Sequence, residues 1–185
     1  MGGQFVVSPD SRLPGHRRKS AHGRGKMSTC MSDFQLTQDA FLEILTMQGL
    51  AGGLAFLNDG VPHRFTAVYR YAGLILKNVC LHDALGKRRP LFLSALPLNK
   101  SLAQFIQPGV PFRTDDSSKD ARLLGHAYDG ILFSYHGTAL VTPAGNLWGT
   151  LCHFDFKPLP LSDADFGILE SVAPAVAAFA VDPHA

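Results

Sequence analysis

Apolar residues at helical spacing predict a first helix between residues 37 and 57. Its apolar face consists of Phe41, Ile44, Leu45 and Met47. Thr37 is a suitable N-cap, because its hydroxyl can accept a backbone N–H of the first turn. Gly49 ends or weakens this helix. A further helical segment through Leu57 closes at Asn58-Asp59-Gly60.

A second apolar stripe predicts a helix that begins at Ser162. Asp163 and Asp165 fall in its first turn, where a carboxylate favours the positive end of the helix. Its apolar face consists of Phe166, Leu169, Val172, Ala173, Val176 and Phe179. Pro174 lacks an N–H and should kink this helix.

Between the two helices, short runs rich in aromatic and β-branched residues predict strands. Residues 65–71 and 74–82 form one expected hairpin, joined at Ala72-Gly73. Residues 132–141 and 147–156 form another. Two hairpins of one antiparallel sheet, with helices packed on a face, make an α+β fold.

The segment between the hairpins is expected to be mostly irregular. Asn99 is a possible cap for a short helix whose apolar residues are Leu102, Phe105 and Ile106. Pro108-Gly109 stops that helix, and residues 114–130 are expected to form a long polar loop.

Composition indicates a globular chain of ordinary domain size. The 185 residues are 46% hydrophobic and 17% charged. No run approaches the roughly 18 consecutive apolar residues of a membrane span, so no membrane association is expected.

The net charge of +2 conceals an uneven distribution. Residues 1–26 contain six Lys or Arg side chains and one acidic side chain, whereas acids outnumber bases in the remainder. Nucleic-acid binding by the folded domain is therefore not expected. Residues 1–32 are interpreted as a basic, disordered leader, 33–181 as one domain and 182–185 as a tail. A basic arm and a targeting peptide are the other interpretations of the leader, and translation from Met27 or Met31 would remove most of it.

The three cysteines, Cys30, Cys80 and Cys152, are too widely spaced to form a CxxC pair. Free thiols in a reducing cytoplasm are expected. Two cysteine–histidine pairs, Cys80 with His82 and Cys152 with His153, are considered as metal ligands. Adjacent residues of a strand point to opposite faces, so no metal site is expected there.

Five segments of the chain resemble a GAF domain. They are Ser101–Ile106, Pro111–Asp115, Gly137–Leu140, Gly149–Asp155 and Leu161–Asp165. The resemblance runs from about Thr37 to Ala180. It implies an antiparallel sheet with the terminal helices on one face. A short helix and loops would cover the other face and enclose a pocket.

The resemblance implies a stand-alone sensory or regulatory domain, because most GAF domains bind small molecules and dimerise. The sequence does not identify the ligand or any cofactor. The expected pocket residues are Phe105, Arg113, Asp115, His126, Tyr128 and Tyr135. A ligand of ordinary size needs a cavity of roughly 300 Å³ or more. A homodimer is expected through the terminal helices, at Phe41, Leu45, Phe166 and Leu169.

Two other functions stay open. Bulky side chains on the pocket-covering segment, among them Leu102, Phe105 and Phe112, would fill the cavity of a protein-interaction module that has no ligand. GAF-fold enzymes such as the free-methionine sulfoxide reductases use cysteines on the pocket-covering segments. Residues 99–145 contain no cysteine, so no enzymatic activity is expected.

Overall fold

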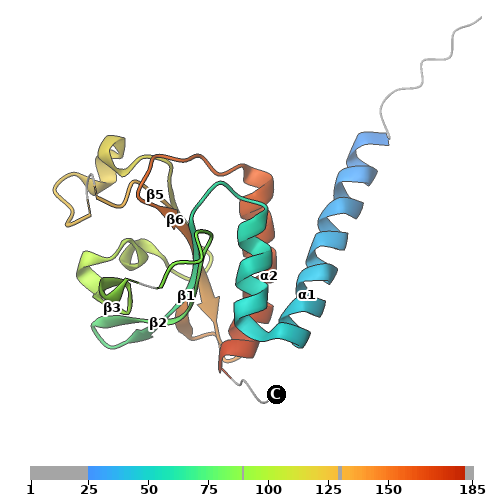
Figure 1. Ribbon diagram of the computed structural model, residues 1–185, viewed down its shortest axis with the longest axis horizontal. Helices are drawn as coiled ribbons and strands as arrows, with labels where there is room; N and C mark the ends of the chain where they lie inside the picture. Colours follow the sequence, from blue (N-terminus) through green and yellow to red (C-terminus); the bar gives the residue numbers. More distant parts are fainter. Residues whose placement is uncertain (1–24, 89, 129–130, 182–185) are drawn as a thin grey trace, which may run out of the picture.

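The computed structural model describes residues 25–88, 90–128 and 131–181, with side chains from Phe34 onward (Figure 1). The helices and strands are α1 (Gly25–Asp59), β1 (Phe65–Ala72), β2 (Ile75–Asp83), β3 (Ala95–Pro97), β4 (Phe112–Thr114), β5 (Ser134–Val141), β6 (Leu147–Asp155) and α2 (Asp163–Val181). The strands form one antiparallel sheet in the order β3-β2-β1-β6-β5-β4. The expected α+β architecture is confirmed.

Both predicted hairpins are present, with strand ends within about two residues of the expected ones. The turn between β1 and β2 contains Gly73 at a φ of 62°, a conformation that glycine adopts without strain. The strand β3 was not predicted from the sequence. It pairs along only three residues of β2, from Ile75 to Lys77. A run this short carries too little alternation to be recognised.

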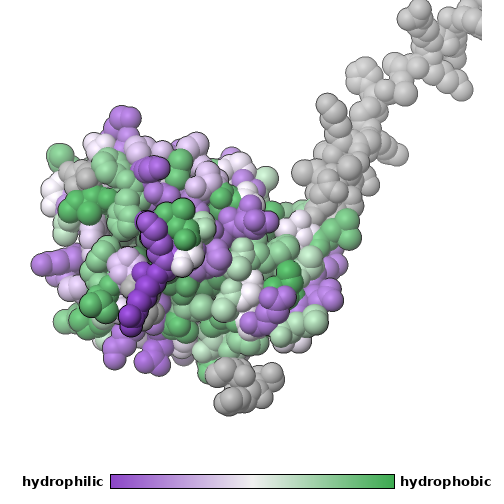
Figure 2. Space-filling view, in the orientation of Figure 1, coloured by the Kyte–Doolittle hydropathy of each residue, from purple (hydrophilic) through white to green (hydrophobic). Residues whose placement is uncertain are grey.

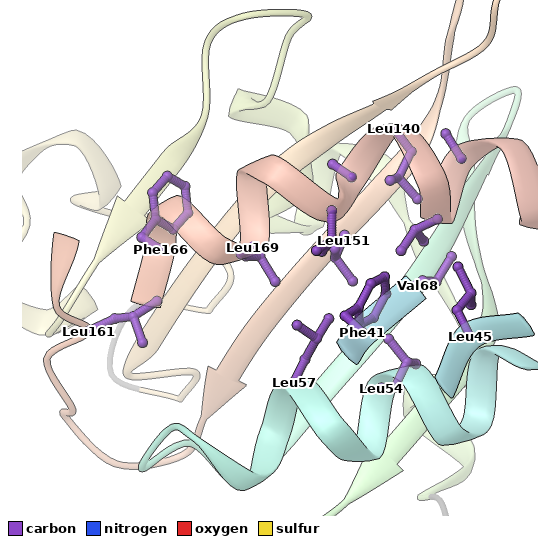
Figure 3. Packing of buried hydrophobic residues seen from close by; sticks show 14 residues of the cluster. Phe41, Leu45, Leu54, Leu57, Val68, Leu140, Leu151, Leu161, Phe166 and Leu169 are labelled. Atoms are coloured by element: carbon purple, nitrogen blue, oxygen red, sulfur yellow. The ribbon is translucent and has the colours of Figure 1, made fainter. Parts of the chain in front are cut away.

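The two helices cover one face of the sheet (Figure 1). Val68, Leu140 and Leu151 project from three strands into the layer between sheet and helices (Figure 3). The helices meet them with the apolar stripes expected from the sequence, and the resulting core is continuous. This packing explains why the segments at the two ends of the chain are helical: each buries an apolar face on the same sheet.

The four side chains expected at a dimer interface belong to this internal core. Phe41 and Leu169 are 0% exposed, and Leu45 and Phe166 are 4% exposed. Figure 3 shows them among the residues packed between helices and sheet. In this structure the four side chains pack against the chain's own sheet, and a contact with a second copy through them stays a prediction.

α1 is longer than expected and bends at Gly49. It begins at Gly25, well before the expected cap at Thr37, and no Gly or Pro interrupts residues 27–48. Gly49 has a φ of 67° and a ψ of −167°, so the helix changes direction there. The leader expected to be disordered therefore contributes its last residues to α1. Residues 1–24 and the expected tail, 182–185, lie outside the described residues.

The predicted start of α2 is confirmed. Ser162 Oγ accepts a hydrogen bond from Asp165 N at 3.1 Å and donates one to Asp165 Oδ2 at 2.6 Å. This reciprocal arrangement satisfies a backbone donor that the first turn leaves without a helical partner. Pro174 lies inside the helix, as expected.

By length and composition, the segments Phe34–Asp59 and Asp163–Val181 are both long and apolar enough to cross a membrane. In this fold their apolar faces pack on the sheet. Phe41, Leu54 and Leu169 are each at most 1% exposed. Core helices of a globular domain meet the same criterion, so it does not by itself indicate a membrane protein.

The opposite face of the sheet is covered by what we call the lid, residues 90–111 and 115–133 apart from 129 and 130. It packs a second core on the sheet, to which it contributes Leu93, Leu102, Ala103, Ile106 and Leu123. Hydrophobic residues also appear at the surface over the lid side (Figure 2). In place of the expected helix there is a single 3₁₀ turn, Leu102–Phe105, capped by Ser101 rather than by Asn99.

Candidate functional site

The cavity beneath the lid is nearly filled. Its volume is about 30 Å³, which is roughly the volume of one water molecule. It is lined by Tyr69, Leu76, Phe92, Leu93, Leu96, Ser101, Leu102, Tyr128, Leu132, Tyr135, Phe154 and Phe156. The cavity of about 300 Å³ expected from the sequence is therefore not present at this position.

Two of the six expected pocket residues, Tyr128 and Tyr135, line this small cavity. Two others form an aromatic group on the lid instead. Phe105 stacks on Phe112 with ring centroids 4.9 Å apart, and His126 lies 5.8 Å from Phe105. These contacts serve the packing of the lid.

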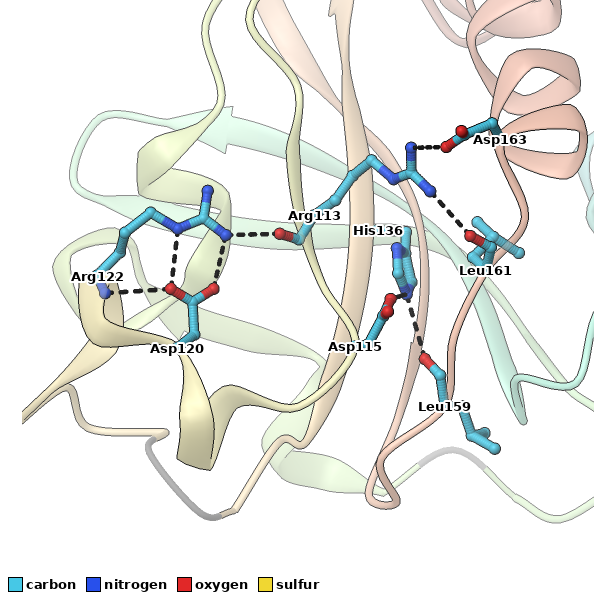
Figure 4. A network of polar contacts seen from close by, with 8 residues as sticks. All are labelled: Arg113, Asp115, Asp120, Arg122, His136, Leu159, Leu161 and Asp163. Carbon is cyan, nitrogen blue, oxygen red and sulfur yellow. Dashed lines mark hydrogen bonds and ion pairs between the residues drawn. The ribbon is translucent and has the colours of Figure 1, made fainter.

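The remaining two, Arg113 and Asp115, do not line the cavity. Figure 4 shows them in a network of polar contacts that reaches the start of α2. Arg113 donates to Asp163 Oδ1 and to the Leu161 carbonyl, both at 2.8 Å, at the start of α2. Its guanidinium lies 4.4 Å from the ring centroid of Phe166. Side chains alternate along a strand, so Arg113 points opposite to Phe112, which is in the lid-side core. The structure does not bring the six residues together.

The acidic loop after β4 is held by its own ion pair. Asp120 accepts two hydrogen bonds from the Arg122 guanidinium, at 2.9 and 2.6 Å (Figure 4). This pairing lowers the pKa of Asp120 to about 2. Arg122 also donates to the Arg113 carbonyl at 2.7 Å. The loop is therefore a folded connection between β4 and β5.

A row of polar side chains crosses the helix-covered face of the sheet. Strand register places His82, Thr66, His153, His136 and Arg113 side by side on β2, β1, β6, β5 and β4. The same face carries Val68 and Leu151 two positions further along their strands. One end of the helix–sheet layer is therefore apolar, and this end is polar.

Three buried imidazoles meet at the polar end, and we call them the histidine cluster: His63, His136 and His153. They are at most 1% exposed. The ring centroids of His63 and His136 are 4.9 Å apart in an edge-on arrangement, and those of His63 and His153 are 6.1 Å apart. His63 comes from the loop between α1 and β1, so the cluster joins the helix layer to two central strands.

A hydrogen-bonded chain holds His153 in place. Asn58 Nδ2 donates to the His63 carbonyl at 2.9 Å and to Thr66 Oγ1 at 2.8 Å. Thr66 Oγ1 in turn lies 2.7 Å from His153 Nδ1. The end of α1, the loop and two strands are thereby linked through buried polar contacts.

The ring nitrogens of His136 and His63 are less completely hydrogen-bonded than those of His153. His136 Nε2 lies 3.4 Å from the Leu159 carbonyl oxygen and 3.5 Å from Asp115 Oδ1 (Figure 4). Within the described residues, His136 Nδ1 and both ring nitrogens of His63 have no hydrogen-bond partner. Each such buried polar atom costs about 1–3 kcal/mol, so the cluster is an expensive arrangement for stability alone.

Burial keeps these imidazoles neutral. Desolvation, together with the neighbouring imidazoles, lowers the pKa of His136 to about 4 and that of His153 to about 3. Desolvation also lowers the pKa of His63, although Asp155 opposes this effect. Neutral imidazoles carry free lone pairs, and the cluster therefore presents uncharged nitrogen ligands at neutral pH.

Two hollows reach the cluster from different sides. A groove of about 870 Å³ is lined by His63, Asn58 and Asp155, together with one side of α1. A smaller cavity of about 210 Å³ lies between α1 and α2 and is lined by His153 and Asp165. Both are larger than the cavity beneath the lid, so the helix-covered face offers more room than the expected pocket does.

The cysteine–histidine pairs considered from the sequence do not converge. Cys152 belongs to the lid-side core, whereas His153 points to the helices. Cys80 packs beside the helix-side core. In the part of the chain that the structure describes, no three His, Cys, Asp or Glu side chains form a ready-made metal shell.

Sequence reasoning missed His63 altogether. It precedes a strand and carries no motif, so its role appears only when the loop folds over the sheet. A partial signal exists for its neighbours. The turn after Val141 places the two histidines near each other on paired strands, but a register shift between Leu140 and Val141 decides that His136 lies opposite His153 rather than Cys152. Arg113 could likewise have been excluded from the pocket by alternation with Phe112.

No known family profile matches the sequence, and no curated protein sequence matches it either. Solved structures are similar. A GAF domain of a phosphoenolpyruvate-protein phosphotransferase from Acinetobacter is 17% identical with a TM-score of 0.65, over 83% of this chain and 96% of that one.

Two further structures share the architecture. The chromophore-binding domain of a bacteriophytochrome from R. palustris is 11% identical with a TM-score of 0.61, over 80% of this chain and 60% of that one. A free methionine-R-sulfoxide reductase from Neisseria meningitidis, solved with its substrate, is 13% identical with a TM-score of 0.55, over 85% and 91%. These neighbours have different functions, and what they share with this chain is the overall fold. The fold of this chain is that of a GAF domain.

Proposed function

We propose that this chain is a non-enzymatic regulatory module that docks a protein partner on its lid. The observation that carries the proposal is the closed cavity beneath the lid. A volume of about 30 Å³ leaves no space for an organic ligand of ordinary size. Tyr69 and Tyr135 occupy the region where such a ligand would lie, and both are at most 5% exposed.

The lid surface supports docking. Leu91 is 89% exposed and Phe92 is 56% exposed, and Phe92 also lines the small cavity. Leu124 and Ile131, further along the lid, are 88% and 55% exposed. Large apolar side chains that rim a shallow apolar depression are typical of a site that receives an apolar side chain from a partner protein.

A sulfoxide-reductase activity has less support. That chemistry needs an accessible thiol with a low pKa. Cys152 is 0% exposed, and burial raises its pKa to about 12. Cys80 packs beside the helix-side core rather than under the lid. Cys152 is a free thiol, which is consistent with the reducing cytoplasm that we infer for this protein.

A homodimer is the alternative. It would form through an exposed stripe of α1 that differs from the stripe expected from the sequence. Leu36 is 65% exposed and Met47 is 75% exposed, and both lie on the side of α1 away from the core. The lid and this stripe are far apart in the chain and can be tested separately.

The test is site-specific photo-crosslinking in the source cells. A photoreactive phenylalanine analogue replaces Leu91 on the lid in one variant and Met47 on α1 in the other. We expect a defined heterologous protein to be crosslinked from Leu91 but not from Met47, and Phe92→Asp to abolish that product. Crosslinking from Met47 to a second copy alone would favour the homodimer. Retention of an organic ligand in native mass spectrometry of the full chain would contradict the closed cavity.

A further inference from the structure

The tautomer of His136 is fixed by its surroundings. The Leu159 carbonyl 3.4 Å from Nε2 can only accept a hydrogen bond, so Nε2 carries the proton. Nδ1 is then left with a lone pair. This atom is buried, and no donor among the described residues reaches it. A carbonyl that holds one imidazole nitrogen while the other binds elsewhere is the usual arrangement of a histidine that ligates a metal.

His153 has a comparable arrangement. Its Nδ1 is occupied by Thr66, whose hydroxyl is itself positioned by Asn58. Ligation would therefore use Nε2. His63 differs, since neither of its ring nitrogens has a hydrogen-bond partner among the described residues. The Leu159 carbonyl is nevertheless close enough to raise its pKa, as are the carboxylates of Asp155 and Asp115, so turning the ring moves it away from that carbonyl.

The spacing of the rings is close to that of a shared ion. An imidazole nitrogen binds Zn²⁺ at about 2.0–2.1 Å, so two ring centroids on one tetrahedral ion are about 5 Å apart. His63 and His136 are 4.9 Å apart and edge-on, at an interplanar angle of 78°. His63 and His153 are 6.1 Å apart and nearly parallel, at 28°. No finished shell exists in the described residues, so binding requires the His63 ring to turn and approach His153.

We propose that His63, His136 and His153 together bind one divalent transition-metal ion of the zinc class. Neutral imidazole nitrogens suit Zn²⁺, Co²⁺ and Ni²⁺, whereas Mg²⁺ and Ca²⁺ prefer oxygen ligands. A fourth position remains for water, because His63 also lines the groove of about 870 Å³. The ion has a path to the site through that groove, which Asp155 also lines.

The site goes beyond partner docking, since it lies on the opposite side of the sheet from the lid. An ion there would tie the loop after α1 to β5 and β6. A ligand that binds only the folded state raises its stability with the logarithm of the ligand concentration relative to Kd. For a chain of this size we expect the melting temperature to rise by about 5–10 °C at a hundredfold excess over Kd.

The experiment uses the full, untagged chain after treatment with a chelator. Zn²⁺ is titrated calorimetrically, and Co²⁺ is followed by its visible absorption, which reports tetrahedral nitrogen coordination. We expect one ion per chain with a Kd below about 1 μM. The decisive variant is His63→Phe, which keeps a flat aromatic ring at this buried position and removes both imidazole nitrogens. It should fold normally and lose at least about 100-fold in affinity.

His126→Gln is the matched control. This histidine lies on the lid, so its substitution should leave the affinity for the metal ion unchanged. His136→Asn is a second variant, and it should also abolish the Co²⁺ spectrum. Absence of 1:1 binding by the wild-type chain would overturn the proposal. Unchanged affinity in His63→Phe would overturn it as well, because the ion would then be held by histidines outside the cluster. Crosslinking from the lid is independent of either result.

Discussion

His136 and His153 are direct partners across β5 and β6, and both side chains point into the layer beneath the helices. Two imidazoles with pKa values of about 4 and about 3 thus lie side by side at buried positions. In an unfolded chain the same groups titrate near 6.5. The difference makes the stability of the fold depend on pH in a known direction.

Acidification should destabilise the metal-free protein between pH 6.5 and pH 4. Below pH 6.5, His136 and His153 bind protons in the unfolded chain but stay neutral in the folded one. Protonation therefore stabilises the unfolded state relative to the folded state. At pH 5 this costs about 2 kcal/mol for each imidazole. We expect the urea midpoint, measured with a chelator present, to fall by about 2 M between pH 7.5 and pH 5.

The control for this titration is His136→Asn, which removes one of the two imidazoles. Its midpoint should fall by about half as much over the same pH interval. Asp115 and Asp155, which lie near the cluster, act in the opposite sense by favouring a charged His63 or His136. Equal midpoints for the wild-type chain at both pH values would contradict the neutral assignment.

Thr66 should be needed for its hydroxyl rather than for its shape. Thr66→Val keeps the branched side chain but leaves His153 Nδ1 without a partner and takes one acceptor from Asn58. We expect a loss of about 2 kcal/mol in the free energy of unfolding. Thr66→Ser keeps the hydroxyl and should cost less than about 1 kcal/mol. Equal losses in the two variants would show that packing, not hydrogen bonding, governs this position.

Arg113 should stabilise the start of α2 through the Leu161 carbonyl more than through its carboxylate partner. The side chain of Asp163 is 96% exposed, and exposed ion pairs contribute little. Arg113→Ala should therefore cost about 2 kcal/mol, because it also removes the contact with the Phe166 ring. Asp163→Asn should cost well under 1 kcal/mol. Thermal unfolding of the two variants compares their losses of stability. A larger loss in Asp163→Asn than in Arg113→Ala would contradict this prediction.

The fold was predictable because its signals are local and repeated. Each element has its own local signal: the apolar stripe that ends at Phe179, the cap at Ser162 and the alternation in both hairpins. The resemblance to GAF domains then predicts how these elements are arranged. The pocket was not predictable in the same way. Whether Tyr135 lines a cavity or fills it depends on side chains from distant segments, and no local pattern reports that. His63 illustrates the same limit.

Gly149 should tolerate no side chain. A Cβ at this position would overlap the Tyr69 carbonyl oxygen and lie 3.3 Å from Arg70 Cα, so β1 and β6 would have to separate. We expect Gly149→Ala to lose more than about 3 kcal/mol and to accumulate as insoluble protein. Gly60→Ala is the matched control, since no atom lies within 4 Å of its added Cβ. Soluble yield and melting temperature decide the comparison, and a soluble Gly149→Ala with an unchanged melting temperature would refute this close approach of the strands.

Cys152 should resist alkylation in the folded protein. Its thiol is 0% exposed, and burial raises its pKa to about 12, so almost no thiolate forms at pH 8. Iodoacetamide labelling, followed by mass spectrometry of the Cys152 peptide, should be at least about 100-fold slower than in urea. Cys80, which is partly exposed, gives an internal comparison and should react faster. Labelling of Cys152 at the unfolded rate would mean that the thiol beneath the lid is open to small molecules. The closed cavity would then be wrong, and the burial of Cys152 would no longer argue against an enzymatic function.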